Sequence, residues 1–409
     1  MKDFFRVKTL EQVIGYVSDF PIVGTEEISL DQALGKIIAT DIISPQDLPN
    51  FSRATMDGYA VKASSTFGAS EGGPAFLTIK GSIQMGDSPN FTLNPGEGAK
   101  ISTGGMLPHG ADSVVMIEHA EAVDDLSIEV YKSVAPGQHV IQAGEDIEKN
   151  ALMISKGQPI RPQEIGLLAA FGIQTVKVFK SPVIGIISTG DEIVPIDQVP
   201  GPGKIRDVNS YTLASQIKKS GAIPVTYGIV RDDYDTLYRQ CESTIQTSDM
   251  VLVSGGSSVG MRDFTTEVLS SLPDSKVLVH GISISPGKPT ILANVQNKAF
   301  WGMPGHVTSA MVVFETVVRP FIDHVRGNLA ENKSSFITPA RLSRNVASAN
   351  GRTDFIRVKL VEKEDGIWAE PILGKSGLIN NMVKADGLVE IGINTEGLNK
   401  GDEVKVTLL

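Results

Sequence analysis

Two segments rich in glycine and serine stand where a protein can bind phosphate. One follows the apolar run at 183–187 and the other follows the apolar run at 250–253; between them they contain Ser188, Thr189, Gly190, Ser254, Gly255, Gly256 and Ser257. Ligands of parallel sheets bind in the loops beyond the carboxyl ends of the strands. Consecutive small residues also let backbone N–H groups converge on an anion. We therefore expect both loops to form one phosphate-binding edge.

Three carboxylates close to these apolar runs could hold a divalent cation. Glu192 and Asp263 belong to the two loop segments, and Asp232 follows a third apolar run. Carboxylates together with phosphate oxygens and water are typical Mg²⁺ ligands, so we predict Glu192, Asp232 and Asp263 as metal ligands. Two alternatives stay open. Asp263 could cap the next helix, and Asp232 with Asp233 could be a cap and a first-turn charge.

A further group of chemically suggestive residues lies in the segment 50–61. Arg53, Asp57 and Gly58 stand together there, just before a β-type run. Taken alone, an Asp-Gly pair indicates a turn, because Gly accepts positive φ and Asp can bond its own backbone. The segment therefore needs support from other parts of the chain before it indicates a function.

Composition limits the class of protein. The chain has 409 residues, 41% hydrophobic and 21% charged, which is typical of a globular protein and long enough for about two to four domains. Its formal net charge is −10 and its pI is near 5.2. Such a charge argues against nucleic-acid binding, which needs a basic surface. An anionic substrate would need a local positive pocket.

Other features argue against export, membrane insertion and zinc chemistry. The N-terminus lacks the pattern of a signal peptide, and no apolar stretch reaches the roughly 20 residues that span a bilayer. Cys241 is the only cysteine, and the six histidines lack metal-ligand spacing. We expect a cytoplasmic protein that binds neither membranes nor nucleic acid.

The pattern of apolar residues divides the chain into four parts. Helical spacing at 9–18, 29–39 and 162–171 predicts a helical or linker domain made of 1–44 with 147–180. Short alternating runs predict a β-rich lobe at 45–146. Apolar runs separated by helices at 181–327 predict a three-layer α/β domain with a mainly parallel sheet. Alternation at 336–409 predicts a small β-barrel-like module.

Several motifs along almost the whole chain resemble those of one family. They are Met56-Asp57-Gly58-Tyr59, Ile101-Ser102-Thr103-Gly104-Gly105, Ala111-Asp112-Ser113-Val114, Gly144-Glu145-Asp146, the two loops described above, and Pro202-Gly203-Lys204-Ile205-Arg206-Asp207-Val208-Asn209. In order and spacing they resemble the molybdopterin molybdenumtransferases, the family of MoeA and the gephyrin E domain. The 181–327 part is similar to the molybdopterin-binding domain of MogA and MoaB.

The resemblance implies an enzyme that inserts molybdate into adenylylated molybdopterin, with Mg²⁺-dependent release of AMP. It implies five catalytic residues: Asp57, Thr103, Asp146, Glu192 and Asp263. It implies that the substrates contact Ser188, Thr189, Gly190, Asp207, Asn209, Asp232, Ser254, Gly255, Gly256 and Ser257. The oxyanion pocket would contain Lys288, Pro304, Ser309, Arg352 and Ser376. A homodimer and a MogA-type adenylyltransferase are the partners it implies.

Two departures from the family pattern concern this oxyanion pocket. Ser285 stands where the family usually has a lysine, three residues before Lys288, and His306-Val307 replaces a usual Asn-Pro. The first change removes a cation; His306 could supply part of one if protonated, or could be a structural histidine. Two alternatives to a molybdate-inserting enzyme therefore stay open: a weakened family member that binds pterin or acts as a scaffold, and a tungstate-handling variant.

Overall fold

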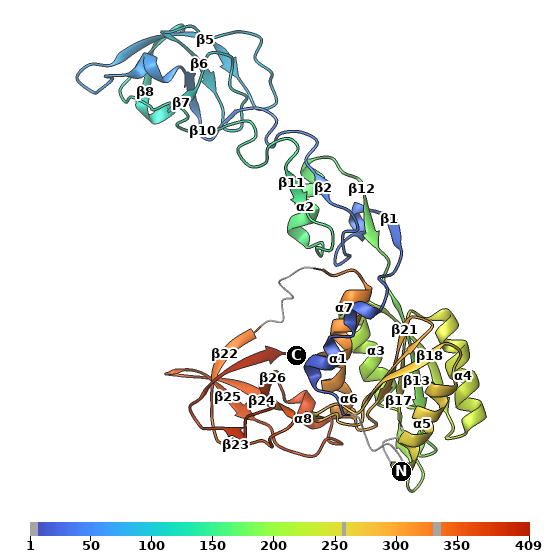
Figure 1. The fold of residues 1–409 in the computed structure, drawn as a ribbon. Helices are drawn as coiled ribbons and strands as arrows, with labels where there is room; N and C mark the ends of the chain where they lie inside the picture. The colour runs from blue at the N-terminus through green and yellow to red at the C-terminus, as the bar shows by residue number, and fades with distance from the viewer. Residues whose placement is uncertain (1–6, 256–258, 330–336) are drawn as a thin grey trace. The chain divides into compact units, whose positions relative to one another are not determined.

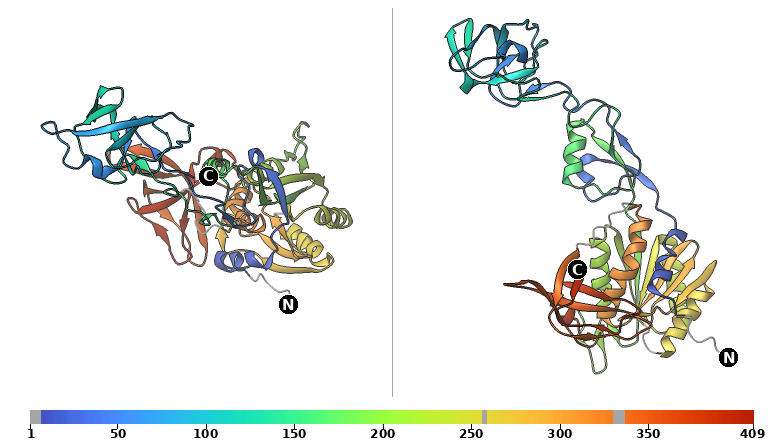
Figure 2. Two further views of the ribbon diagram at one scale, coloured as in Figure 1. Left: turned by 90° about the horizontal axis from the view of Figure 1, so that it is seen from above. Right: turned by 60° about the vertical axis from the view of Figure 1, so that its left-hand side comes forward.

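The computed structural model describes residues 7–255, 259–329 and 337–409, without the side chains of 259–263. The chain forms two compact units, each of which is described by itself (Figures 1 and 2). One unit contains the described residues up to Thr40, Lys156–Gly166 and Gln174–Leu409. The other contains Asp41–Ser155 and Leu167–Ile173.

The smaller unit contains the segment 45–146, for which a β-rich lobe is predicted, together with flanking residues. Its main sheet has the strand order β7-β4-β6-β5-β9-β8. The strands are β4 (Gly58–Val61), β5 (Ala75–Ile83), β6 (Glu97–Ile101), β7 (Ser113–Met116), β8 (Ala120–Asp124) and β9 (Ser127–Val130). Shorter pairs join β3 (Arg53–Ala54) to β10 (Val140–Ile141), and β2 (Ile42–Ile43) to β11 (Leu152–Ile154). Apolar side chains on β5 alternate as predicted, since Leu77 is buried and Phe76 exposed.

A six-stranded sheet forms the centre of the larger unit, with the order β16-β13-β17-β21-β20-β18. Its strands are β13 (Val183–Thr189), β16 (Ile223–Val230), β17 (Met250–Ser254), β18 (Ser275–His280), β20 (Ile291–Val295) and β21 (Lys298–Met303). The first four strands of that order are parallel, and β20 runs antiparallel to both of its neighbours, β21 and β18. The predicted parallel-rich sheet is therefore confirmed, with an antiparallel edge.

Helices cover both faces of this sheet (Figure 1). On one face, α3 (Asn209–Lys219) and the helix that begins at α6 (Val307–Val313) pack on Ile184, Ile186 and Leu252. On the other, α4 (Tyr234–Thr247) and α5 (Val259–Ser271) cover Ile187, Val251 and Val253. Burial on both faces explains why these strands are continuous apolar runs in the sequence. The three-layer arrangement agrees with the prediction.

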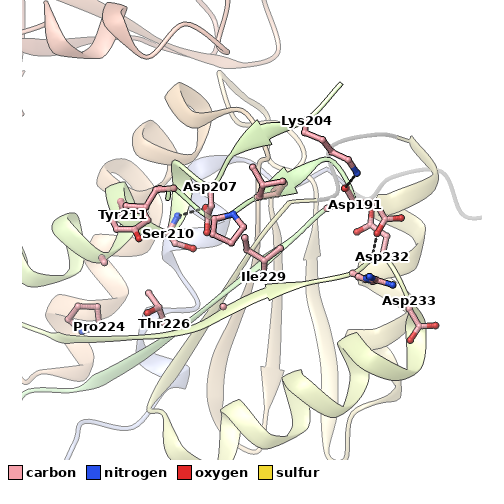
Figure 3. A pocket seen from close by; sticks show the side chains of 18 of the residues that line it. Asp191, Lys204, Asp207, Ser210, Tyr211, Pro224, Thr226, Ile229, Asp232 and Asp233 are labelled. Atoms are coloured by element: carbon pink, nitrogen blue, oxygen red, sulfur yellow. Dashed lines mark hydrogen bonds between the residues drawn. The ribbon is translucent and has the colours of Figure 1, made fainter. Parts of the chain in front are cut away.

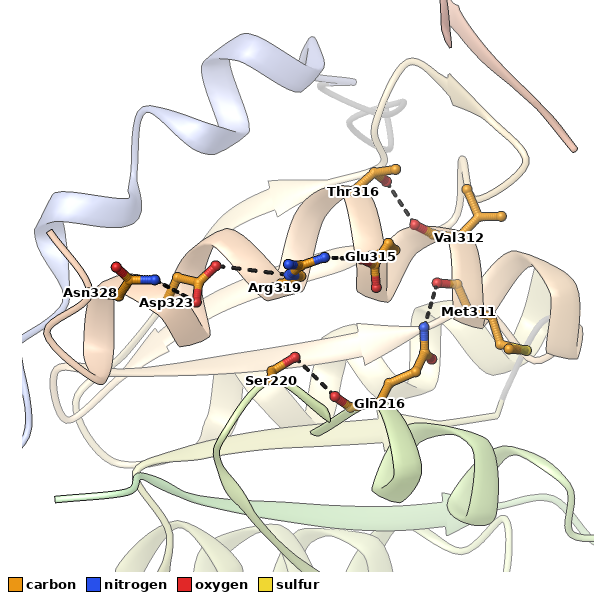
Figure 4. A network of polar contacts seen from close by, with 9 residues as sticks. All are labelled: Gln216, Ser220, Met311, Val312, Glu315, Thr316, Arg319, Asp323 and Asn328. Carbon is orange, nitrogen blue, oxygen red and sulfur yellow. Dashed lines mark hydrogen bonds and ion pairs between the residues drawn. The ribbon is translucent and has the colours of Figure 1, made fainter. Parts of the chain in front are cut away.

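The helix from Val307 to Val325 is continuous but irregular. After α6 it passes through one π-helical segment (Phe314–Val318) into α7 (Arg319–Val325), which accommodates Pro320 in its first turn. Figure 4 shows Arg319 between the carboxylates of Glu315 and Asp323 on this helix. No helix in the described parts of the chain is long and apolar enough to cross a bilayer.

The C-terminal residues close a five-stranded barrel, as predicted. The strands β24-β25-β22-β28-β26 follow one another, and β26 pairs back to β24. The five barrel strands are β22 (Ile337–Leu342), β24 (Thr353–Lys363), β25 (Gly366–Pro371), β26 (Gly387–Ile391) and β28 (Glu403–Leu408). The same part of the chain also contains two short strands, β23 (Val346–Ala347) and β27 (Gly397–Leu398), and a short helix, α8 (Asn380–Val383). β19 (Ile284–Ser285), from the α/β part, pairs with β24 and joins the two.

One helix prediction was wrong. The segment 29–39 contains only a 3-10 turn (Leu30–Gln32), after the strand β1 (Thr25–Ser29) that pairs with β12 (Thr175–Phe179). Beyond the turn, the backbone N–H groups of Ile38 and Ala39 donate to distant carbonyls rather than to the preceding turn. Pairing with other segments therefore outweighed local helical spacing. The helix expected at 9–18 is shorter, α1 (Leu10–Ile14), and the helix at 162–171 is α2 (Pro162–Ala170).

Candidate active site

The two glycine-rich loops lie side by side at the carboxyl edge of the parallel sheet. Ser188 on β13 is the register partner of Ser254 on β17, and both residues are buried. The loops approach so closely that a Cβ on Gly255 would lie 1.9 Å from the carbonyl oxygen of Thr189. Gly255 is therefore required by this contact, at a φ of 143°. Gly256 and Ser257 lie outside the described residues.

Asp232 faces this edge, whereas Asp233 does not. The Asp232 carboxylate accepts a hydrogen bond from Thr189 Oγ1 at 2.8 Å and one from the Asp191 N–H at 3.3 Å. Asp233 is the N-cap of α4, where it accepts from the backbone N–H of Thr236 at 2.9 Å, and its bonds to Thr236 lower its pKa. The capping alternative is thus confirmed for Asp233 only.

A cleft of about 1110 Å³ opens beside Asp232, between β16, α3 and the short parallel pair of β14 (Ile193–Val194) and β15 (Ile205–Arg206). Figure 3 shows Asp191, Lys204 and Asp232 at one end of it, and Asp207, Ser210 and Tyr211 at the other. Gly190 also lines the cleft. Asp207 is buried and accepts from the Ser210 N–H at 3.1 Å, so it fixes the start of α3.

The predicted metal ligands are only partly brought together. Asp191, rather than Glu192, lies against Asp232, with the Asp232 N–H 3.4 Å from the Asp191 carboxylate. The Glu192 carboxylate folds back over Gly190, where an added Cβ would lie 2.9 Å from Oε2. Within the part of the chain that the structure describes, no three His, Cys, Asp or Glu side chains gather as a metal site.

Asp263 lies inside α5, four residues after the helix begins at Val259. The alternative that Asp263 caps this helix is therefore wrong, because an N-cap residue directly precedes the first helical residue. Its side chain lies outside what the structure describes. The oxygen chemistry of Glu192, Asp232 and Asp263 suits Mg²⁺, and the exposed Glu192 carboxylate forms no ion pair with another described residue that would hold it away from a cation.

Asn209 connects the sheet edge to a second loop. Its Nδ2 donates to Ser254 Oγ at 2.7 Å and to the Gly305 carbonyl at 2.9 Å. The Oδ1 of Asn209 and the Oγ of Ser188 are buried and have no partner among the described residues. Buried polar atoms without partners are rare in folded proteins, so these two atoms mark a place where a ligand group or water would be stabilised.

A second cleft, of about 740 Å³, brings the predicted oxyanion residues together. It is lined by the loop around β19, the loop before α6, and the start of β24 with the following barrel loop; the predicted residues among its lining are Lys288, Pro304, Ser309, Arg352 and Ser376. We call it the cationic cleft, because its described lining contains Lys288, His306, Arg352 and Arg357 and no carboxylate. A protein with a net charge of −10 thus has a positive recess.

The charges of the cationic cleft differ in how far they are neutralised. Arg352 Nε lies 3.0 Å from the buried Asp354 carboxylate, which also accepts a hydrogen bond from Ser348. Lys288 is exposed and forms no ion pair with any described residue. His306 Nδ1 lies 3.0 Å from Ser376 Oγ, so this histidine connects two lining loops.

Arg357 is the lining residue that the sequence reasoning missed. It stands on β24 and is only 8% exposed. On this strand, Thr353, Phe355 and Arg357 share one face, and Phe355 packs into the core of the α/β part, whereas Val358 on the other face belongs to the barrel core. A charged residue thus falls in line with a buried phenylalanine. That break in the pattern was the signal available in the sequence.

The remaining predicted residues lie in the smaller unit. Asp57 Oδ1 accepts two hydrogen bonds from Thr103, one from its N–H at 2.6 Å and one from Oγ1 at 2.8 Å. These bonds, the backbone one first, lower the pKa of Asp57. Asp146 is exposed, and its backbone N–H donates to the Leu48 carbonyl. The structure therefore joins Asp57 to Thr103 and leaves the Asp146 side chain apart from them.

Comparison with known proteins agrees with this arrangement over nearly the whole chain. Residues 8–172 match the "MoeA N-terminal region (domain I and II)", residues 185–324 the "Probable molybdopterin binding domain", and residues 339–409 the "MoeA C-terminal region (domain IV)". The molybdopterin molybdenumtransferase of Nostoc sp. is 31% identical over 94% of this chain and 89% of its own length. The chain belongs to the MoeA family.

Two further relatives support the assignment. The molybdopterin molybdenumtransferase of Bacillus subtilis is 30% identical over 94% of this chain and 90% of the relative. A crystal structure of a molybdopterin biosynthesis MoeA protein from Pyrococcus horikoshii superimposes with a TM-score of 0.82 at 41% identity, covering 98% of this chain and 99% of that one. The MoeA family is one of transferases, and the fold prediction is confirmed.

The two departures from the MoeA family pattern both lie in the cationic cleft. Ser285 and His306 line it, and Ser285 is the register partner of Asp354, the residue paired with Arg352. The missing lysine thus leaves the cleft with Lys288 as its one described lining lysine.

We predict that replacing Thr103 with valine raises the pKa of Asp57 toward its ordinary value. The variant loses the Oγ1 bond and keeps the backbone bond, which is the larger cause of the lowered pKa. A lowered folded pKa means that ionised Asp57 contributes stability above the unfolded pKa and loses it as the pH falls through the folded pKa. Titration of the Asp57 carboxyl ¹³C resonance would measure the shift. Thr103→Ser, which keeps the hydroxyl, should titrate like wild type; identical curves for Thr103→Val would contradict the prediction.

Proposed function

We propose that this protein inserts molybdate into adenylylated molybdopterin, with release of AMP, as a molybdopterin molybdenumtransferase. The observation that supports this most is the cationic cleft, in which Lys288, Arg352, Ser309 and Ser376 come together from the α/β part and the barrel. Molybdate is a small tetrahedral dianion, and cations and hydroxyls on several sides suit such a ligand. Tungstate has the same charge and shape, so the cleft accommodates it on the same terms.

The phosphate groups of the substrate would lie at the sheet edge formed by the two glycine-rich loops. Backbone N–H groups of these loops suit an anion, and the buried, partnerless Ser188 Oγ and Asn209 Oδ1 mark unused polar positions nearby. We propose Glu192, Asp232 and Asp263 as the residues that would hold Mg²⁺ there. The ion would neutralise charge on the phosphates when bound.

The cellular setting follows from the same proposal. A MogA-type adenylyltransferase would supply the adenylylated substrate. We also propose a cytoplasmic location: the single cysteine, Cys241, is a buried free thiol whose pKa is raised by burial to about 12, and it needs no oxidising compartment.

A homodimer is the proposed assembly. An apolar groove on the larger unit is lined by α3, α6, α8 and the C-terminal Leu409. Its exposed apolar residues include Ile196, Val208 and Tyr211. Exposed apolar patches often mark interfaces, and two-fold homodimers are the commonest soluble assemblies. A second copy of this chain is therefore the occupant that we propose for the groove.

We predict that Lys288→Ala nearly eliminates molybdate-dependent cofactor formation while release of AMP without molybdate continues. A charge-assisted contact to an anion contributes on the order of 1.5 to 3 kcal/mol, or about tenfold to a hundredfold in affinity. The assay would follow cofactor formation against molybdate concentration. Lys359→Ala, an exposed lysine on β24 outside the cleft, is the matched control. Wild-type molybdate dependence in Lys288→Ala would refute the proposed pocket, whereas the absence of cofactor formation by the wild-type protein would favour a non-inserting family member.

We predict that Glu192→Gln and Asp263→Ala each abolish Mg²⁺-dependent AMP release and leave the folded protein intact. Carboxylates that ligate a metal contribute little to core packing. AMP would be measured by chromatography across a Mg²⁺ titration, with circular dichroism as the check on folding. Asp233→Asn, at the helix cap beside Asp232, is the control that should keep the metal dependence. Full turnover in both variants would remove these residues from the metal site.

We predict that the wild-type protein sediments as a dimer at micromolar concentration and that Tyr211→Glu shifts it toward the monomer, because the change puts a charge in the apolar groove. Sedimentation velocity would measure both. Phe76→Glu, at a strongly exposed aromatic residue of the smaller unit, is the matched control and should stay dimeric. A monomeric wild-type protein would count against the proposed assembly, and a dimeric Tyr211→Glu would place the interface elsewhere.

A further inference from the structure

Arg357 is buried at the wall of the cationic cleft. It lies on β24 of the barrel, is 8% exposed, and lines the cleft together with Lys288 and Arg352. One end of its guanidinium is fixed, because NH2 donates to the Gly374 carbonyl at 3.1 Å. Gly374 also lines the cleft. This bond thus holds the side chain against another residue of the cleft wall.

A second donor of this guanidinium, Nε, is buried without a partner in the described part of the chain. Among the described residues, no atom accepts a hydrogen bond from Nε of Arg357. Burial lowers the pKa of the guanidinium, and no carboxylate counteracts that effect. Buried charges in proteins are normally paired, since an unpaired one costs several kcal/mol. A buried arginine with a free Nε beside a cleft without carboxylates therefore suits an anion supplied from outside the chain.

The ion pair of Arg352 supports the same conclusion. Arg352 is already paired with Asp354, at 3.0 Å, so much of its charge is neutralised. Lys288 and Arg357 form no ion pair with any described residue. Two uncompensated positive charges correspond to the two negative charges of a tetrahedral dianion. His306 is engaged through Nδ1 with Ser376 and is not needed to complete this count.

We propose that Arg357 is a direct oxyanion-binding residue and supplies the second fixed positive charge of the cleft, in place of the lysine absent at Ser285. The proposal rests on the proposed function of the cleft and names a residue for it. A guanidinium offers planar paired donors and always carries its charge. Arg357 would therefore bind the dianion through the N–H groups that its bond to Gly374 leaves free, while the exposed Lys288 binds from the solvent side.

The test compares molybdate affinity in the full-length protein by isothermal titration calorimetry. Arg357→Gln keeps a hydrogen-bond donor and loses the charge; we expect molybdate to bind at least about tenfold more weakly. Arg357→Lys keeps the charge and should bind between wild type and Arg357→Gln. The matched control is Arg344→Gln, an arginine of the same barrel that donates to the Pro371 carbonyl at 3.2 Å outside the cleft; it should bind within about twofold of wild type.

Thermal melting separates a binding role from a structural one. Without anion, Arg357→Gln should melt at or above the wild-type temperature, because it removes a buried charge that has no counter-ion. With molybdate, its melting temperature should rise less than that of wild type. Arg357→Met fills similar space without charge and is the substitute should the glutamine variant not fold. Wild-type molybdate affinity in the neutral variants would overturn the proposal, as would equally weak binding by Arg357→Lys and Arg357→Gln.

A titration with AMP shows whether Arg357 binds molybdate or a nucleotide phosphate. AMP is titrated in the same variants, since a nucleotide phosphate shares the charge and shape of an oxyanion. A loss of AMP affinity with unchanged molybdate affinity would overturn the proposal and assign Arg357 to the phosphate. If wild type binds no molybdate, the proposed function of the cleft fails as well; if wild type binds it and Arg357→Gln binds it equally, only the role of Arg357 fails.

Discussion

The cationic cleft depends on the pairing of two strands that are about 70 residues apart in the chain. β19 in the α/β part pairs with β24 of the barrel, so that Ile284 is opposite Thr353 and Ser285 is opposite Asp354. The Thr353 N–H also donates to the Ser283 carbonyl at 2.9 Å. Because these backbone bonds fix the start of β24, they place Arg352 and Arg357 beside the loop that carries Lys288. Without this pairing, neither part would have a complete set of cations.

A second constraint is the close contact of loops at the carboxyl edge of the parallel sheet. Any side chain on Gly255 would collide with the Thr189 carbonyl, so the two loops can meet only with glycine there. Asn209 then bonds both Ser254 and the Gly305 carbonyl, and Gly305 is next to His306 in the cationic cleft. The sheet edge and the cleft are therefore mechanically connected through one buried amide. A ligand that spans both regions would therefore bind to loops whose relative position is fixed by the hydrogen bonds of Asn209.

The sequence predicted those features that depend on local chemistry and on burial over several residues. Continuous apolar runs identified β13 and β17, and short alternating runs identified β5 and the barrel strands, because each pattern reflects how many faces of a strand are buried. The helix prediction for 29–39 was wrong because the backbone hydrogen bonds of this segment go to residues far away in the sequence. Local periodicity does not reveal such bonds. The sequence could not decide which of Asp232 and Asp233 faces the sheet edge for a similar reason. Only the position of Thr189, which donates a hydrogen bond to Asp232, decides it. The position of Arg357 in the strand pattern was visible in the sequence, but its burial without a counter-ion among the described residues is a property of the folded strand.

The change from lysine to Ser285 need not weaken the oxyanion site if the second charge is held elsewhere. An exposed lysine is a hydrated point charge on a flexible stem, and it loses side-chain entropy when an anion binds. A guanidinium held by the Gly374 carbonyl has already lost that freedom on folding, and its desolvation is likewise complete before the ligand arrives. The loss of side-chain entropy and the desolvation of the guanidinium then lower the folding stability rather than the free energy of anion binding. The chain can therefore give up an exposed cation at one position because a buried one acts more strongly per charge in a medium of lower dielectric constant. In a protein with a net charge of −10, such a local arrangement is also what allows a dianion to approach at all.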